Sequence, residues 1–281
     1  MAPPPANWEA ELREWRENRA RGLTGEASWL TLVGLFWLDE ERAYTIGSAS
    51  DADFRLAVGS APPRIGTFTR TGASVRFDAA PGVDITINDA PIAASVLRSD
   101  RDEKPDVVKV GRITMTLIDR DGRLAIRTKD PESPARAEFA GLEYFPIDAG
   151  HRVQAAFEPF PAPREVTIPT ATGVDSTMKA PGLLRFRLGG REHAILGFGE
   201  PDALSLFVIF KDGTSGTSTY GAGRYLDATR EADGTFVLDF NRAYNPPCAF
   251  TSFATCPYPP PENVLPVAIE AGEKDYRKHS L

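Results

Sequence analysis

The sequence has few of the residues that build metal and redox centres. Its 281 residues include only two cysteines and three histidines, and the histidines lie far apart along the chain. Two thiols alone cannot complete a tetrahedral zinc site. The HExxH, CxxC and Walker A motifs are also missing, so metalloprotease, dithiol oxidoreductase and P-loop chemistry lack support. We therefore expect no bound metal and no cofactor.

Long apolar runs and clusters of positive charge are missing too. The most apolar run, Ala27–Leu38, has 12 residues, fewer than the roughly 18 to 20 that a membrane-spanning helix needs. The longer uncharged run Ala243–Pro261 contains six prolines, which exclude a spanning helix. A net charge of −7 and a pI near 5.2 argue against binding to a nucleic-acid backbone. We expect neither membrane nor nucleic acid as a partner.

The amino terminus lacks the pattern of an export signal. Residues Met1–Asn7 contain no cationic start followed by an apolar segment, so we expect a cytoplasmic protein unless a leader has been removed. In a reducing compartment, Cys248 and Cys256 are expected to be thiols.

Glycine and proline, by contrast, are abundant, with 24 of each. Such frequent breaks favour many short elements over long helices. The hydrophobic share of 42%, with 16 phenylalanines, is enough for a packed core and excludes a disordered chain. The length fits two domains or one large all-β domain.

The clearest helix is predicted over Trp8–Arg21, with Asn7 as its N-cap and Gly22 at its end. Trp8, Leu12 and Trp15 follow at helical spacing and form one apolar stripe. The stripe is expected to dock on the body of the chain or, alternatively, on a second copy that makes a homo-oligomer.

After this helix the apolar period changes to two, which is typical of strands. We predict a mainly β protein in three parts: the amphipathic helix and a linker over residues 1–27, a β-sandwich over 28–130, and a second, barrel-like β domain over 131–281. The boundary falls in the proline-containing segment Asp130–Ala135. In the second part, Leu184–Phe198 reads as a hairpin around Gly189-Gly190, and Val264–Ile269 as the last strand.

The first β domain resembles a forkhead-associated (FHA) sandwich. Thr45–Ser48 followed by Asp53–Leu56, then Pro62–Gly66 and Val83–Ile92, stand where that family has its motifs. Ser48 occupies the position of the arginine that grips phosphate, and the serine and histidine of the second motif are missing. The resemblance therefore implies the fold without phosphothreonine recognition.

A second resemblance covers most of the chain. The blocks SWLTLVGLFW (Ser28–Trp37), YGAGRY (Tyr220–Tyr225) and DFNRAYNPPC (Asp239–Cys248), with Cys256-Pro257 and Asn263, are similar to a prokaryotic family known as a numbered domain of unknown function. That family implies no particular activity.

Polar side chains concentrate after the most apolar strand of the second domain. We predict that six of them, within 34 residues, line a pocket for a small polar or anionic molecule: Lys211, Tyr220, Arg224, Asp239, Asn241 and Tyr244. On an extended chain Tyr220 and Arg224 share one face, where a phenol and a guanidinium can hold an anion. The alternative for Arg224 is an internal ion pair with Asp212 or Asp239.

Two residues in this segment are candidates for catalysis. Asp239 is either a general base, oriented beside Asn241, or a turn cap. Cys248 is a nucleophile, one half of a reversible disulfide with Cys256, or an inert buried thiol. Glu270 and Glu273, at the end of the chain, are either paired carboxylates or exposed side chains.

Two functions remain open after this reading. The first is a small-molecule binding protein, with or without enzymatic activity, whose site lies in the second domain. The second is a protein-interaction or scaffold module that uses the sandwich and the helix. The second function predicts a solvent-exposed Trp8/Trp15 stripe and no polar cavity in the second domain.

Overall fold

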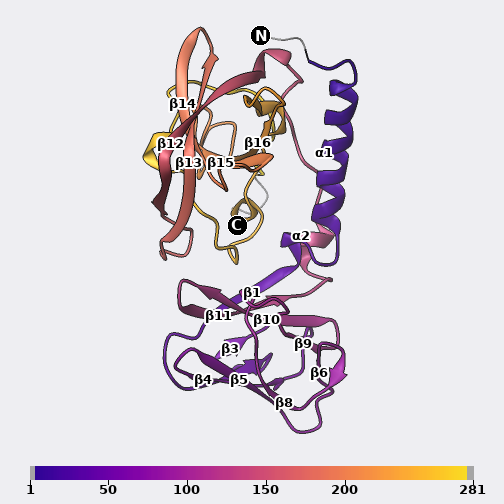
Figure 1. The fold of residues 1–281 in the computed structure, drawn as a ribbon. Helices are drawn as coiled ribbons and strands as arrows, with labels where there is room; N and C mark the ends of the chain where they lie inside the picture. Colours follow the sequence, from indigo (N-terminus) through magenta and orange to yellow (C-terminus); the bar gives the residue numbers. More distant parts are fainter. Residues whose placement is uncertain (1–3, 277–281) are drawn as a thin grey trace. The chain divides into compact units, whose positions relative to one another are not determined.

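The computed structural model describes residues 4–276 and confirms a mainly β protein with an amino-terminal helix (Figure 1). The chain divides into two compact units. The sandwich unit is Leu23–Phe139, and the curled-sheet unit takes in the chain before Leu23 and from Ala140 onward. The helix, for which a separate part with a linker over residues 1–27 was predicted, lies almost entirely within the curled-sheet unit.

The sandwich unit consists of two sheets. The six-stranded sheet has the order β1–β11–β10–β9–β6–β7, and the five-stranded sheet has the order β3–β2–β4–β5–β8. The elements of this unit are η1 (Trp29–Thr31), β1 (Leu32–Trp37), β2 (Ala43–Gly47), β3 (Phe54–Arg55), β4 (Gly66–Thr71), β5 (Ser74–Ala79), β6 (Thr86–Ile87), β7 (Ala90–Pro91), β8 (Ala94–Val96), β9 (Val107–Val110), β10 (Ile113–Arg120), β11 (Arg123–Lys129) and α2 (Pro134–Ala137).

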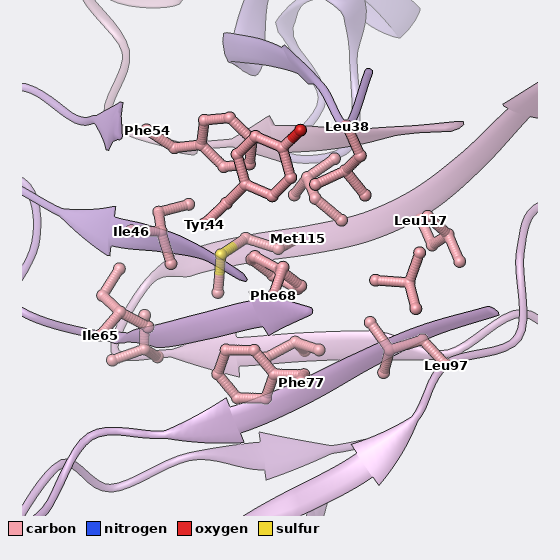
Figure 2. Close-up of a cluster of buried hydrophobic side chains, with 14 of the residues drawn as sticks. Leu38, Tyr44, Ile46, Phe54, Ile65, Phe68, Phe77, Leu97, Met115 and Leu117 are labelled. Carbon is pink, nitrogen blue, oxygen red and sulfur yellow. The ribbon is translucent and has the colours of Figure 1, made fainter. Parts of the chain in front are cut away.

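Alternating side chains fill the space between these two sheets. In β10, Met115 and Leu117 are buried, whereas Thr114 and Thr116 are less so, as a strand with one face on a core requires. Figure 2 shows Met115 and Leu117 in one cluster with Tyr44, Phe68 and Phe77, which come from β2, β4 and β5 of the other sheet. This shared core holds the sandwich together.

The curled-sheet unit has one sheet of order β14–β13–β12–β17–β16–β15. Beyond the end of β14, Phe198 exchanges two backbone hydrogen bonds, of 2.8 and 2.9 Å, with Phe207 of β15. The two outer strands therefore meet, and the sheet curls into a half-barrel. Its elements are α1 (Trp8–Thr24), η2 (Ala149–His151), β12 (Arg152–Ile168), β13 (Ser176–Leu188), β14 (Arg191–Gly197), β15 (Ser205–Phe210), β16 (Arg224–Arg230), β17 (Phe236–Asp239), η3 (Phe240–Arg242), η4 (Pro247–Ala249) and η5 (Pro261–Asn263).

Helix α1 docks on the curled-sheet unit through its apolar stripe. Trp8 and Leu12 are buried, and Trp15 lies against Tyr244 with ring centroids 6.4 Å apart. The exposed stripe that the interaction-module reading predicted is therefore wrong. A second copy of the chain would have to use another face of this helix. The helix also continues past Gly22, because this glycine does not adopt the left-handed conformation that commonly ends a helix.

The last predicted strand, Val264–Ile269, is also wrong. This segment makes one isolated bridge, between Val264 and Lys211, and is otherwise irregular. Its alternating apolar residues pack into the core of the curled sheet, where Leu265 and Ile269 are buried, but Pro266 lacks the N–H that a continuous ladder needs. Within residues 4–276, no helix is both long and apolar enough to span a membrane.

Candidate functional site

Arg224, at the start of β16, is fully buried in an internal ion pair. Its Nη2 donates to Asp212 Oδ2 at 2.8 Å and to the Ile269 carbonyl at 2.9 Å, and its Nη1 donates to the Ala271 carbonyl. Burial lowers the pKa of Arg224, and the charge of Asp212 opposes that effect. The guanidinium therefore ties the carboxy-terminal segment to the sheet and is enclosed by the chain's own acceptors.

Asp239 and Asn241 lie where β17 passes into η3. Asp239 caps that turn by accepting from the Asn241 backbone N–H at 3.2 Å, and its other oxygen accepts from the Trp8 indole at 2.6 Å. Asn241 exchanges two bonds with the backbone of Asp148, of 3.0 and 2.9 Å. Both side chains are buried and join a turn, a loop and helix α1.

Lys211, Tyr220 and Tyr244 are half-buried and lie in different surroundings. Lys211 follows β15, and its backbone pairs with Asn263 and Leu265. Tyr220 donates its hydroxyl to the Cys248 carbonyl at 3.1 Å. Tyr244 lies under helix α1, and its burial raises its pKa. The structure thus brings Tyr220 to Cys248 and Arg224 to Asp212, and within residues 4–276 the side chains of Tyr220, Arg224 and Asp239 hydrogen-bond to different partners.

A buried carboxylate near the carboxy terminus forms a second network. Glu273 is fully buried and pairs with Arg19 of α1 at 2.5 Å, while its other oxygen accepts from the Asn245 N–H at 2.8 Å. The Arg19 guanidinium also lies over the Tyr244 ring, 4.7 Å from its centroid. Glu270, by contrast, is exposed, so the two glutamates do not form a carboxylate pair. The sequence analysis missed Arg19, although it follows Trp15 by one helical turn.

Cys248, Cys256 and Tyr220 meet in what we call the thiol cluster. Cys248 is half-buried in η4, Cys256 is buried, and both are free thiols. The Cys248 backbone N–H donates to Cys256 Sγ at 3.0 Å. The two proline-rich stretches around these cysteines thus approach each other, which brings together groups eight positions apart.

The groups of the thiol cluster shift the pKa values of its two thiols in opposite directions. The hydrogen bond from the Cys256 thiol lowers the pKa of Cys248, burial opposes this effect, and the Tyr220 hydroxyl adds to the lowering. The same thiol–thiol hydrogen bond and burial raise the pKa of Cys256. Cys248 is therefore the thiolate-prone member of the pair.

A groove on the curled sheet also holds charged side chains, and the sequence analysis missed it. We call it the arginine groove. It has a volume of about 580 Å³. Its lining residues come from β12, β13, β14 and the residue just before β17: Val153, Gln154, Ala156, Arg185, Phe186, Arg187, Glu192, His193, Ala194 and Thr235. Alternation in β13, where Arg185 and Arg187 interrupt Leu184, Phe186 and Leu188, was the signal that could have located it.

The match to a protein family lies almost entirely within the curled-sheet unit. The family model described as "Protein of unknown function (DUF1684)" matches residues 137–274. The solution NMR structure of an uncharacterised protein from Haloarcula marismortui is 34% identical, covering 53% of this chain and 85% of that chain, with a TM-score of 0.43. The chain belongs to the DUF1684 family.

Two FHA domains are also similar to part of this DUF1684 chain. The FhaA FHA domain, determined in complex with the intracellular domain of Rv3910, is 20% identical over 34% of this chain and 97% of that chain, with a TM-score of 0.23. A structure from a study of phosphothreonine-dependent FHA domain interactions is 21% identical over 35% and 96%, with a TM-score of 0.24. No curated protein matches the chain.

The DUF1684 match contains every candidate residue of the carboxy-terminal half that is described above. It covers the Arg224–Asp212 pair, the thiol cluster and the arginine groove. Arg19, on helix α1, lies outside the matched segment. Among residues 4–276, no group of three or more histidine, cysteine, aspartate or glutamate side chains is placed to hold a metal ion.

Proposed function

We propose that the curled-sheet unit of this DUF1684 protein binds a small molecule carrying an anionic group, and that the arginine groove is its site. The observation that carries the proposal is the position of Arg187 in this groove. Arg187 is exposed, and its bond to the Gly190 carbonyl is long, at 3.4 Å. A guanidinium in that state offers several N–H donors to a carboxylate or phosphate.

The surroundings of Arg187 support a ligand of small size. Arg185 points from the same face of β13 because side chains two positions apart in a strand share a face. Ala156 and Ala194 flank Arg185 in the neighbouring strands, and their short side chains leave space beside the arginines. The volume of about 580 Å³ lies within the range of roughly 300 to 1,000 Å³ of small-molecule sites.

Polar groups at the edge of the groove would bind the rest of the ligand. Gln154 donates to the Thr235 hydroxyl at 2.8 Å, and both groups keep further hydrogen-bonding capacity. Arg185 is already paired with Glu158, and Glu192 lies opposite Arg187 in the register. Two carboxylates near two guanidiniums favour a ligand with one anionic group and neutral polar substituents over a polyanion.

In this proposal, the six residues predicted from the sequence support the structure of the unit and do not bind the ligand. Arg224 is enclosed by acceptors of the chain itself, so a ligand on it would have to displace Asp212. Asp239 has a comparable role as the cap of η3. We therefore place the proposed ligand at Arg187 and not at these residues. The proposed location of the protein remains the cytoplasm. No catalytic step is proposed at the groove.

NMR titration of the full chain tests this proposal. Gluconate, a monocarboxylate with neutral hydroxyl groups, and inorganic phosphate are added to the labelled protein, and we expect amide shifts that saturate at residues of β12, β13 and β14. Arg187→Ala should weaken gluconate binding about tenfold, the effect of losing one charge-assisted contact of about 1.4 kcal/mol.

The control is Arg191→Ala, which removes an exposed arginine that does not line the groove. It should leave gluconate binding within twofold of the unaltered chain. Shifts that stay linear to high concentration, or that are equally weakened by both substitutions, would rule out a site at the groove.

The interaction-module alternative now depends on the sandwich unit alone. Trp8 and Leu12 of the helix are buried and Trp15 is half-buried within the curled-sheet unit, so most of this stripe is already covered. The titration also separates the two functions, because an interaction module predicts no saturable small-molecule shifts in the curled sheet.

A further inference from the structure

The thiol cluster combines a reachable sulfur with an enclosed one. Cys248 lies in η4 and is half-buried, while Cys256 is 4% exposed. Cys256 Sγ is 3.0 Å from the Cys248 backbone nitrogen, and the two thiols are hydrogen-bonded to each other. A disulfide requires a close approach of the two side chains. Here that approach exists in the reduced state.

The reachable thiol is also the better nucleophile. Hydrogen bonds from Cys256 and Tyr220 lower the pKa of Cys248, whereas the first of these bonds and burial raise the pKa of Cys256. Because the thiolate is the reacting form, the first reaction with an electrophile is expected at Cys248. Cys256 stays protonated until its partner has reacted.

We propose that Cys248 and Cys256 form a peroxide-reactive dithiol, in which Cys248 is the site of oxidation and Cys256 closes the disulfide. This chemistry is separate from ligand binding at the arginine groove and uses none of the groove's residues.

The proposed reaction has two steps. In the first, the Cys248 thiolate attacks one oxygen of a hydroperoxide, an S–O bond forms, and the O–O bond breaks. The alkoxide or hydroxide that leaves takes up a proton to give the alcohol or water, and Cys248 becomes a sulfenic acid. In the second step, Cys256 loses its proton and attacks the Cys248 sulfur. The S–S bond forms, the S–O bond breaks, and the hydroxide leaves as water with that proton.

The electron balance of these steps is complete with one hydroperoxide. Two thiols together lose two electrons and two protons, and the hydroperoxide gains both. An external dithiol reductant returns the pair to its starting state by disulfide exchange. The half-buried position of Cys248 in a rigid, proline-flanked turn favours a small oxidant over a protein disulfide.

Mass spectrometry of the full chain tests the proposal. One equivalent of hydrogen peroxide should give a monomer that has lost two hydrogen atoms, with Cys248 and Cys256 in one cross-linked peptide. In Cys256→Ser the sulfenic acid should persist on Cys248, where dimedone traps it. In Cys248→Ser, Cys256 should stay unmodified under the same conditions.

A hydroxyl substitution tests the role of the cluster geometry. Tyr220→Phe removes a hydroxyl that lowers the pKa of Cys248, so less of this thiol is ionised at neutral pH and its reaction with peroxide should slow severalfold. The matched control is Tyr258→Phe, which removes a nearby phenol that is not among the groups that shift the pKa of Cys248. It should change the rate less than twofold.

Limited alkylation of the unaltered chain keeps the proposal testable if a cysteine variant fails to fold. With less than one equivalent of iodoacetamide, the label should appear on Cys248 before Cys256. The proposal is wrong if Cys256 is labelled first, if peroxide produces only disulfide-linked dimers, or if both thiols survive peroxide unchanged.

Discussion

At the scale of single residues, the buried charges of the curled-sheet unit are held by one another. The side chains of Arg224 and Asp212 are 0% and 1% exposed. Asp212 additionally accepts from the Thr214 N–H at 2.8 Å and the Thr214 hydroxyl at 2.6 Å. A pair enclosed in this way adds little to the free energy of unfolding. Removing one member is nevertheless strongly destabilising, because the other is left as an uncompensated buried charge.

The first residue-scale prediction concerns this pair. Asp212→Asn keeps the shape of the side chain and removes its charge, so the Arg224 guanidinium is left uncompensated inside the unit. We expect the free energy of unfolding to fall by about 3–5 kcal/mol, measured by urea denaturation at pH 7. Asp202→Asn, at an exposed position in the loop after β14, is the control and should change it by less than about 0.5 kcal/mol.

Residue types and short spacings predicted part of this chemistry. The ion pair of Arg224 with Asp212 was one of two interpretations of the same segment, because both residues lie close in sequence. The Arg19–Glu273 pair joins residues 254 positions apart, and no local pattern reports such a contact. The arginine groove was missed for a similar reason, since the alanines beside Arg185 come from two other strands.

At the scale of elements, helix α1 is held to the curled-sheet unit by a narrow set of contacts. Leu12 is fully buried at the centre of the stripe, while Trp8 donates its indole N–H to Asp239. Arg19 completes the docking through Glu273 and the Asn245 carbonyl, at 2.8 Å. The helix therefore depends on both an apolar contact and two buried polar anchors.

Leu12→Ala tests the apolar part of this docking. The substitution keeps a good helix former, so its effect reports lost packing and a cavity. We expect a loss of about 2–5 kcal/mol in the stability of the curled-sheet unit. Amide hydrogen exchange in the full chain should show faster opening of β16 and β17. Glu14→Ala on the exposed face is the control, and equal effects of both substitutions would contradict the docking.

Elements with a repeated apolar period were predictable, and isolated segments were not. The Leu184–Phe198 hairpin and the alternation of β10 came from a period of two that turn residues interrupt. Val264–Ile269 shows the same alternation, but its few backbone hydrogen bonds to Lys211 and Gly213 form one isolated bridge and no continuous ladder. Its apolar side chains fill the core although its backbone does not join the sheet. Paired strands show the same alternation, so the hydrophobic pattern does not distinguish the two kinds of segment.

At the scale of the whole molecule, each unit has its own core, so each can respond differently to acid. In the sandwich unit, Asp53 joins β2 to the start of β3. Its carboxylate accepts from the Thr45 N–H at 2.8 Å, the Thr45 hydroxyl at 2.7 Å and Arg42 at 2.8 Å. These bonds lower the pKa of Asp53 from 3.8 to about 2, with the Thr45 backbone as the largest cause.

The sign of the acid response follows from this lowered pKa. The folded sandwich favours the ionised form of Asp53, so the carboxylate stabilises this unit above about pH 4. That contribution is lost as the pH falls through about 2. Because Asp53 is exposed, solvent screening reduces it to about 1 kcal/mol at pH 7.

Asp53→Asn in the full chain should therefore destabilise the sandwich unit at pH 7 and have almost no effect near pH 2. Hydrogen exchange of the β2 and β4 amides measures this unit separately from the curled sheet, whose exchange should not change. Asp51→Asn is the matched control, because Asp51 lies two residues away and pairs only with the exposed Arg64. A constant difference between Asp53→Asn and the unaltered chain across this pH range would show that the Thr45 and Arg42 bonds do not favour the carboxylate.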